Sequence, residues 1–282
     1  MSGGGEERAP EAGAAPGPAA AGPAGSGLRA RAGAEAALVV AAVQFLTRLP
    51  APDMGWSDDR LARAARHFPT AGALVGLICA AVYFLASSAF PPAVAAGLAL
   101  AASMLATGGL HEDGLADCID GLGGGRTRER AMEIMRDSRI GSYGAAAMLV
   151  SALLRWAALA SLDAAAGAAA LVVCHALSRA APTAVLAACR NARSGDAAKD
   201  IAGGVTGSEA LAAGTMAAAL ALGLLGPEAA VFALAAAIAG GFTMALWAVT
   251  RLGGYTGDVL GATEQATHVA ALLALSALLG AS

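Results

Sequence analysis

Long stretches without a charged side chain dominate the sequence. One of them, residues 70–90, contains no Asp, Glu, Lys or Arg. An α-helix needs about 20 apolar residues to cross the ~30 Å hydrocarbon layer of a bilayer. A weaker stretch begins at about residue 268, and the stronger ones are residues 70–90, 92–110, 143–162, 165–189, 209–226 and 228–250. The pattern predicts an all-α, polytopic integral membrane protein with about six to eight apolar helices.

The connections between these segments are of two kinds. Three are tight turns without Lys or Arg: Phe90-Pro91-Pro92, Leu162-Asp163-Ala164 and Gly226-Pro227-Glu228. The others are long and polar and hold 13 of the 18 Lys and Arg residues: 48–69, 111–142, 190–208 and 251–267. Positively charged loops remain in the cytoplasm. We therefore expect three antiparallel helical hairpins whose long loops form one cytoplasmic face.

The N-terminal region differs from the rest of the chain. Residues 1–27 are almost all Gly, Ala, Pro and Ser. Such a segment buries too little apolar surface to offset its ordering entropy, so we expect it to be disordered. The remainder, residues 28–282, is expected to be one helical membrane domain. Its first apolar stretch, residues 32–47, is short for a span and predicts a re-entrant or interfacial helix instead.

Composition agrees with the membrane assignment. The chain of 282 residues is 57% hydrophobic and 14% charged, whereas soluble domains are about 25% charged. The net charge of −3 says little, because the charges are distributed unevenly along the chain. We expect the lipid bilayer as a partner and no nucleic acid. The four cysteines form no C-x-x-C pair, which argues against a disulfide framework or a thiolate metal site.

Three aspartates follow the segment 92–110. Asp113, Asp117 and Asp120 stand at positions i, i+4 and i+7, so in a helix they share one face, within about 60° around the axis. Like charges at a membrane boundary repel one another, and a divalent cation removes this penalty. Oxygen-only ligands favour Mg²⁺ or Mn²⁺ over zinc. The spacing predicts a magnesium site, and the alternative is a solvated acidic helix end.

A second charged group follows the three aspartates. Both groups lie in residues 108–144, which we expect to form the catalytic loop. Arg136 and Arg139 flank Asp137. Guanidinium groups bind phosphate oxygens in a fork geometry, and the carboxylate could complete a metal shell. This combination favours a diphosphate ligand. The arginines at 126, 128 and 130 are explained by the general excess of positive charge in cytoplasmic loops.

A glycine-rich stretch, residues 253–264, closes the polar part of the chain. Glycines such as Gly257 and Gly261 let backbone N–H groups approach a ligand closely, as phosphate-binding loops require. Asp258 and Glu264 could add a metal ligand or a general base. A loop of this kind is a weak signal by itself, because ordinary turns also contain glycine.

Charged residues also occur inside the apolar segment 165–189. Arg179 follows His175 and Ser178 there. Ionisable groups at membrane depth usually face a cavity or a partner. We expect Arg179 either to pair with a loop carboxylate or to extend toward the membrane surface.

Carboxylates for a divalent ion, arginines for phosphates and a glycine-rich segment on one face together suggest phosphoryl transfer. In that chemistry a protein mainly positions the reactants and neutralises charge. A membrane location implies a lipid-like substrate or a pathway tethered to the bilayer.

The motifs resemble one known family. HEDGLADCIDG at 111–121 and EIMRDSRIGSYG at 133–144 are similar to the corresponding motifs of cobalamin synthase, the adenosylcobinamide-GDP ribazoletransferase family. Glu112 departs from the pattern, since family members often carry an apolar residue there. The resemblance covers residues 34–282, with supporting matches in FLTRLPAP at 45–52, FPTAG at 68–72, SR at 178–179 and TGDVLGATE at 256–264.

The resemblance implies a bacterial inner-membrane enzyme that depends on Mg²⁺. In the family's reaction, the 5′-hydroxyl of α-ribazole, or of α-ribazole 5′-phosphate, displaces GMP from adenosylcobinamide-GDP. The product is adenosylcobalamin or its 5′-phosphate. The family setting also leaves open association with other enzymes of cobalamin biosynthesis.

The same resemblance suggests roles for the motif residues. Asp113, Asp117 and Asp120 would hold one or two Mg²⁺ ions on the diphosphate. Arg136 and Arg139 would stabilise charge on the transferring phosphoryl group and on the departing GMP. The metal shell or the general base remains open among Asp137, Asp258 and Glu264, with His111 as a further candidate base.

Two alternatives come from other classes of protein. CDP-alcohol phosphotransferases carry D-x-x-D-G-x-x-A-R, whereas residues 113–120 read D-G-x-A-D-x-x-D without Ala-Arg. A cation-coupled transporter would use the aspartates as an ion site, but transporters usually place such sites on broken helices at mid-membrane. Here the acidic residues cluster in one long loop.

Overall fold

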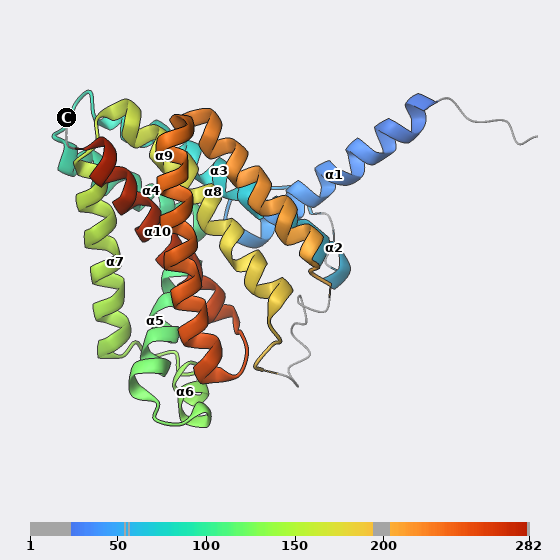
Figure 1. Ribbon diagram of the computed structural model, residues 1–282, viewed down its shortest axis with the longest axis vertical. Coiled ribbons are helices and arrows are strands. Elements are labelled where there is room, and N and C mark those ends of the chain that lie inside the picture. Colours follow the sequence, from blue (N-terminus) through green and yellow to red (C-terminus); the bar gives the residue numbers. More distant parts are fainter. Residues whose placement is uncertain (1–23, 54, 56, 194–203, 281–282) are drawn as a thin grey trace, which may run out of the picture. The chain divides into compact units, whose positions relative to one another are not determined.

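Figure 1 shows the computed structural model, which describes residues 24–53, 55, 57–193 and 204–280. The chain divides into two compact units, Met1–Glu35 and Ala36–Ser282. The described part of the first unit is the beginning of one helix, and all other described helices belong to the second unit. Of the tail predicted to be disordered, residues 1–23 lie outside the described residues, and a helix begins at Ala24.

Helices are the regular elements of this protein, and no β-strand forms in the described part of the chain. In chain order they are α1 (Ala24–Leu46), α2 (Asp58–Ala64), the 3₁₀ helix η1 (Ala65–His67), α3 (Phe68–Ala86), α4 (Pro92–Thr107), α5 (Leu110–Gly124), α6 (Arg128–Ile134), α7 (Ser142–Ala160), α8 (Ala164–Ala188), α9 (Gly207–Leu252) and α10 (Gly257–Leu279).

Several of these helices can cross a membrane. Five described stretches are long and apolar enough: Asp59–Ala86, Ser142–Ala160, Ala164–Ala188, Gly207–Leu252 and Gly257–Leu279. Helices α4 and α5 satisfy the same criterion only as a bent pair, which would add a sixth crossing, whereas α1 does not satisfy it. The predicted all-α, polytopic membrane fold is confirmed.

All three predicted tight turns are present. Helices α3 and α4 are joined by residues 87–91, and α7 and α8 by residues 161–163. Helix α9 is interrupted at Gly226, where φ is 75° and ψ is 172°, immediately before Pro227. The chain turns back at this point, and the two halves of α9 form an inverted V in the view of Figure 1.

The α7–α8 connection differs from the expected hairpin, because its two helices have mostly different neighbours. Helix α8 packs against α3, α9 and α10, whereas α7 packs against α4, α5 and α10. Burial explains the separation: 78% of the most apolar window of α8 lies inside the protein, but only 28% of that of α7. A central helix and a peripheral one share a turn without packing along their lengths.

Two predicted long loops are largely helical. Residues 111–142 contain nearly all of α5, all of α6 and the first residue of α7. The prediction of a loop over 251–267 is wrong, because α10 already begins at Gly257. The Thr256 hydroxyl caps this helix by accepting the N–H of Val259 at 3.2 Å. The first turns of α10 are polar, so hydropathy alone does not detect this start.

Helices α4 and α5 meet at a sharp bend of 89°. Gly108 and Gly109 form it with φ of 69° and 72°, a left-handed conformation that side chains with a Cβ rarely adopt. A Cβ on Gly108 would also collide with the side chain of Arg48. The bend redirects the chain so that α5 packs against α6, α7 and α10.

Buried charged groups connect α5, α7, α8 and α10. On α8 and α10, Arg179 forms an ion pair with Glu264 at 2.5 Å, and the Ser178 hydroxyl donates to the same carboxylate at 2.7 Å. On α5 and α7, Glu112 pairs with Arg155 at 3.2 Å. The expectation that Arg179 pairs with a carboxylate is confirmed, although its partner belongs to a helix.

Gln265 joins these two ion pairs into one network. Its amide N–H groups donate to Glu112 at 3.2 Å and to Glu264 at 3.1 Å, and its carbonyl accepts the hydroxyl of Ser151 at 3.0 Å. We call the connected set the interior network: Glu112, Ser151, Arg155, His175, Ser178, Arg179, Glu264, Gln265 and His268. Its two carboxylates face two guanidinium groups, so the formal charges balance inside the bundle.

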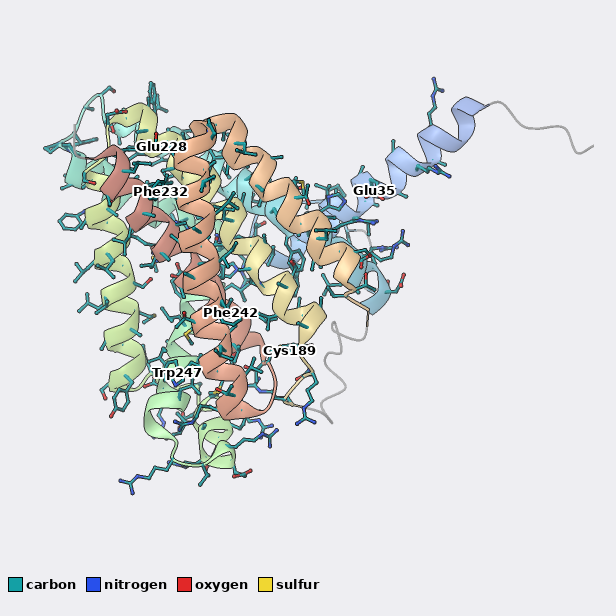
Figure 2. All side chains as sticks on the ribbon, in the orientation of Figure 1. Glu35, Cys189, Glu228, Phe232, Phe242 and Trp247 are labelled. Carbon is teal, nitrogen blue, oxygen red and sulfur yellow. The ribbon has the colours of Figure 1, made fainter. Side chains whose placement is uncertain are left out.

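The outer faces of the helices are apolar. Phe232, Phe242 and Trp247 of α9 are exposed by 53%, 65% and 41% and are labelled in Figure 2. Exposed apolar side chains of this size are unfavourable in water but match the hydrocarbon of a bilayer. Polar groups inside and apolar groups outside are what a membrane-embedded bundle requires.

Tyr83 provides a first test of this packing. Its buried hydroxyl lies 2.9 Å from the carbonyl oxygen of Leu159 and 2.8 Å from that of Leu162. We expect Tyr83→Phe to lower the free energy of unfolding by about 1–2 kcal/mol, because it leaves buried carbonyls without this donor. Unfolding in mixed detergent micelles measures the effect. Tyr143→Phe, at a ring that is 56% exposed, should change stability little; equal effects would contradict this role.

The interior network gives a second prediction, based on the Glu112–Arg155 pair. Glu112→Leu leaves the guanidinium of Arg155 buried and uncompensated, so we expect a loss of about 3–5 kcal/mol in unfolding free energy. The double variant Glu112→Leu/Arg155→Leu should recover most of that loss. For comparison, removing the exposed pair Arg130–Glu133 should cost about 1 kcal/mol or less. Additive losses from the two Leu substitutions would show that the pair is not coupled.

Candidate active site

Helix α5 carries the three aspartates of the predicted metal site. Asp113, Asp117 and Asp120 all lie within it, so the helical condition for their shared face is fulfilled. Their surroundings nevertheless differ: Asp113 is exposed, Asp117 is partly buried, and Asp120 retains 7% of its exposure. The three side chains therefore do not have equal access to a ligand.

Helix α10 approaches α5 closely beside these aspartates. A Cβ on Gly114 would lie 3.2 Å from the Cα of Gly261 and 3.3 Å from the Cα of Asp258. A Cβ on Gly261 would lie 3.1 Å from the Cα of Gly114. The two backbones thus meet at a pair of glycines, and this contact places Asp258 next to the acidic face of α5.

The result is a group of like charges. Asp113, Asp258 and Asp120 each act electrostatically on Asp117 as neighbouring negative groups, while Arg193 acts on it with the opposite sign. Arg193 also pairs with Asp258 at 2.7 Å. We call Asp113, Asp117 and Asp258 the carboxylate cluster. Only one guanidinium is seen to oppose these three carboxylates among the described residues, whereas the interior network pairs each carboxylate with an arginine.

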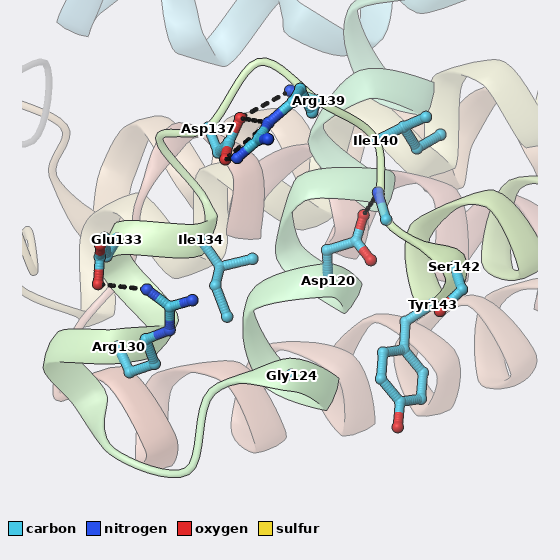
Figure 3. Close-up of a pocket in the computed structure, with 11 residues that line it drawn as sticks. Asp120, Gly124, Arg130, Glu133, Ile134, Asp137, Arg139, Ile140, Ser142 and Tyr143 are labelled. Atoms are coloured by element: carbon cyan, nitrogen blue, oxygen red, sulfur yellow. Dashed lines mark hydrogen bonds and ion pairs between the residues drawn. The ribbon is translucent and has the colours of Figure 1, made fainter.

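A cavity of about 510 Å³ opens between the end of α5, helix α6 and the start of α7 (Figure 3). The segment between α6 and α7, residues 135–141, forms one side of it; we call this segment the arginine loop. The residues that line the cavity are Asp120, Gly124, Arg130, Glu133, Ile134, Asp137, Arg139, Ile140, Gly141, Ser142 and Tyr143.

Within the arginine loop, Asp137 and Arg139 form an ion pair. The guanidinium of Arg139 donates to both carboxylate oxygens of Asp137, at 3.0 Å and 3.2 Å from Nε and 2.6 Å from a terminal nitrogen (Figure 3). These hydrogen bonds lower the pKa of Asp137 to about 2 and raise the pKa of Arg139. A phosphate that binds Arg139 must therefore replace or share this carboxylate. Arg136 is exposed in the same loop.

Asp120 interacts with the beginning of α7. Its carboxylate accepts the N–H of Gly141 at 2.7 Å and the N–H of Gly144 at 2.9 Å. Both oxygens are thus engaged by backbone groups, a situation that the spacing of the three aspartates did not reveal.

Arginines on the same end of the bundle hold connecting segments together. Arg128 donates to the carbonyl oxygens of Leu252 and Ala192, at 2.6 Å and 2.8 Å. Arg190 donates to Gly253 at 2.8 Å, and Arg251 to Gly125 at 3.0 Å. Their positive charges lie at the C-terminal end of α9, which they stabilise.

Two predicted site residues lie in the interior instead. Glu264 is fully buried in its pair with Arg179, and His111 is 5% exposed with Glu264 and Arg179 among its electrostatic neighbours. The prediction placed both in polar loops, which was wrong because α5 and α10 are packed helices there. The structure groups them with the interior network and leaves Asp258 alone to extend the acidic face.

The predicted glycine-rich loop also requires correction. Gly257 is the first residue of α10, and Gly261 lies one turn further inside the helix. Gly261 makes the close contact with Gly114 inside a helix, so it does not belong to a flexible loop. The binding role predicted for Gly257 stays a prediction.

The donor chemistry of the carboxylate cluster suits Mg²⁺. Among the described residues, no three His, Cys, Asp or Glu side chains converge closely enough to enclose a metal ion. Mg²⁺ does not require such an enclosure, because it usually takes one or two carboxylates and completes its shell with water and substrate phosphates. Asp113 and Asp117, the two accessible members on α5, fit that donor set.

Sequence reasoning missed Arg193, Arg155 and Gln265 as partners of these groups. Arg193 lies in a loop that the sequence marks only as long and positively charged, and Arg155 is a charged residue inside the apolar segment 143–162. A charged residue in an apolar segment was the one available signal, and it does not identify the partner helix.

Comparison with known proteins gives a consistent result. The family model described as "Cobalamin-5-phosphate synthase" matches residues 38–276. An adenosylcobinamide-GDP ribazoletransferase of Leptothrix cholodnii is 44% identical over 85% of this chain and 94% of its own length. Proteins with the same name are 42% identical in Ralstonia nicotianae and 44% in Bradyrhizobium diazoefficiens, over 84% of this chain and 93% and 92% of theirs.

No solved structure matches the chain significantly. The family assignment therefore depends on sequence, and it covers both helices of the carboxylate cluster and the arginine loop. Such identity over more than four-fifths of each protein is not produced by shared apolar composition alone, because it spans the polar segments as well. The chain belongs to the cobalamin-5-phosphate synthase family.

Proposed function

We propose that this protein is an adenosylcobinamide-GDP ribazoletransferase that depends on Mg²⁺. The 5′-hydroxyl of α-ribazole, or of its 5′-phosphate, attacks the phosphorus attached to the cobinamide, and GMP leaves. The observation that carries the proposal is the carboxylate cluster beside Arg193 at the same end of the bundle as the arginine loop, in a chain whose relatives bear this name.

The carboxylate cluster provides the metal ligands in this proposal. Asp113 and Asp117 would hold Mg²⁺, with Asp258 one helix away. The bound ion neutralises charge on a diphosphate and on the oxygens of the transferring phosphoryl group. Without a cation, these carboxylates would repel a diphosphate. Their arrangement therefore favours substrate binding only when positive charge is also present.

Two arginines supply the remaining positive charge. Arg193 is 24% exposed and paired with Asp258 of the cluster. Arg139 is 86% exposed, so it can turn from Asp137 to a phosphate oxygen at little cost. Such guanidinium groups bind phosphate in a fork geometry and stabilise the departing GMP. Arg136, exposed in the same loop, has the corresponding role.

The predicted candidates for the general base are not equally suited. Asp137, with a pKa of about 2, is ionised at neutral pH but accepts protons weakly. Glu264 and His111 are buried inside the helical bundle. Asp258 is the remaining candidate, because it lies in the cluster and is only partly covered. It therefore receives the proton of the ribazole hydroxyl in this proposal.

The positively charged end of the bundle supports a cytoplasmic active face in a bacterial inner membrane. Arg128, Arg190, Arg193 and Arg251 all interact around the connections at this end. Positive charge accumulates on the cytoplasmic side of membrane proteins. Adenosylcobinamide-GDP and α-ribazole would then bind from the cytoplasm, where other enzymes of the pathway could dock.

The proposal is tested by measuring GMP release from the purified protein in liposomes. With adenosylcobinamide-GDP, α-ribazole and Mg²⁺ present, we expect GMP release that requires both the acceptor and the metal. Asp117→Asn should lower kcat/KM by roughly 10²-fold or more, because it removes a charged metal ligand.

Glu228→Gln is the matched control, since it changes an exposed carboxylate at the bend of α9 (Figure 2). It should leave GMP release unchanged. A folded wild-type protein that releases no GMP in the complete mixture would contradict the proposed reaction, and equal activity of Asp117→Asn and wild type would contradict the metal site.

A further inference from the structure

The N-terminus of α7 lacks a capping side chain of its own. Its N-cap residue is Gly141, and the first backbone N–H groups of any helix need acceptors from outside the helix. Asp120, on α5, supplies them: one carboxylate oxygen accepts from Gly141 and the other from Gly144. A carboxylate at this end of a helix also interacts favourably with the helix dipole. The cap of α7 is therefore provided across a helix–helix contact.

The fit between Asp120 and this backbone is close. A Cβ on Gly141 or on Gly144 would collide with the carboxylate of Asp120, and one on Gly144 would also meet the carbonyl oxygen of Ala116. Glycine at both positions is therefore what allows the carboxylate to reach the two N–H groups.

This arrangement separates Asp120 from the other aspartates of α5. Its two oxygens are occupied, and the residue is 7% exposed. Asp113 is exposed and Asp117 is partly buried, and in the described part of the chain no hydrogen bond joins either carboxylate to the arginine loop. The helical face shared by the three aspartates thus has an accessible part, with Asp113 and Asp117, and an anchored part, with Asp120.

Helix α5 contacts the arginine loop at both ends. The loop leaves α6 at Met135, which is buried and would collide with a Cβ on Gly121 of α5, and it ends at Gly141. Asp120 precedes Gly121 on α5, the helix that also carries Asp117, and it accepts the N–H of Gly141. Asp120 and Gly121 of α5 therefore contact the two ends of the loop that carries Arg139.

We propose that Asp120 is a positioning residue that fixes the arginine loop against α5, and that it is not a metal ligand. The proposal rests on the proposed function, since the loop carries Arg136 and Arg139 to the diphosphate. It replaces the role that the spacing of the three aspartates suggested.

Asp163 offers a matched control at a different turn. One oxygen of its carboxylate accepts the N–H groups of Ala165 and Ala166, both at 2.8 Å, so Asp163 caps α8 as that helix's own N-cap residue. Asp163→Ala also removes a carboxylate that caps a helix, at the turn between α7 and α8, without touching the carboxylate cluster or the arginine loop.

The experiment compares Asp120→Ala, Asp117→Asn and Asp163→Ala with the wild-type protein in detergent. Hydrogen–deuterium exchange followed by mass spectrometry reports on residues 138–146, Mn²⁺ binding by electron paramagnetic resonance reports on the metal site alone, and GMP release gives kcat and the half-saturating Mg²⁺ concentration.

For Asp120→Ala we expect exchange in residues 138–146 to accelerate by roughly tenfold. We also expect kcat to fall by about 10- to 100-fold, because misplaced charges stabilise the transition state poorly. Mn²⁺ affinity and the half-saturating Mg²⁺ concentration should stay within about twofold of wild type. Asp117→Asn should do the reverse: weaken metal binding by about tenfold or more and leave the exchange unchanged.

Asp163→Ala should accelerate exchange only at the start of α8 and preserve kcat. If Asp120→Ala weakens Mn²⁺ binding as Asp117→Asn does while exchange stays slow, Asp120 is a ligand and the proposal is wrong. Should Asp120→Ala fail to fold, Asp120→Asn retains one acceptor oxygen and is expected to show a smaller acceleration at unaltered Mn²⁺ affinity. If the wild type releases no GMP, the proposed function fails, but exchange and Mn²⁺ binding still decide the role of Asp120.

Discussion

The contact between Gly114 of α5 and Gly261 of α10 is the constraint on which the rest of the site depends. Two helix backbones approach so closely there that a Cβ at either position would require the facing backbone to shift by a few tenths of an ångström. Asp117 and Asp258 lie to one side of this contact, and Glu112 and Gln265 belong to the network on the other. A larger residue at the crossing would separate both groups at once. One packing contact thus positions the accessible acids and the buried ion pairs.

The interior network and the carboxylate cluster differ in how far their charges are neutralised. In the interior network, Glu112 and Glu264 each face an arginine, which keeps the cost of burying charge tolerable in a bundle with apolar outer faces. In the carboxylate cluster, repulsion is opposed only in part, by Arg193. An arrangement that is unfavourable by itself but becomes favourable with a cation and a phosphate is typical of a binding site. Stability and function are therefore served by neighbouring parts of the same helices.

Predictions from the sequence succeeded where the signal is local. Apolar length and the distribution of arginines predicted the spans, the tight turns and the polar end of the bundle, since each depends on residues next to one another in the chain. The shared face of Asp113, Asp117 and Asp120 likewise depends only on helical periodicity. The start of α10 was missed because its first turns are polar, and hydropathy does not distinguish a buried polar helix from a loop.

The sequence by itself determined that this protein is a helical membrane protein, and its motifs indicated the family and the acidic helix face. Only the tertiary structure decided which polar groups meet: Asp258 joins Asp117, Glu264 pairs with Arg179, and Asp120 holds the start of α7. The physical reason is that hydropathy and periodicity are properties of one segment. The partner of a carboxylate depends on how helices distant in the chain cross, and here two glycines without side chains set that crossing.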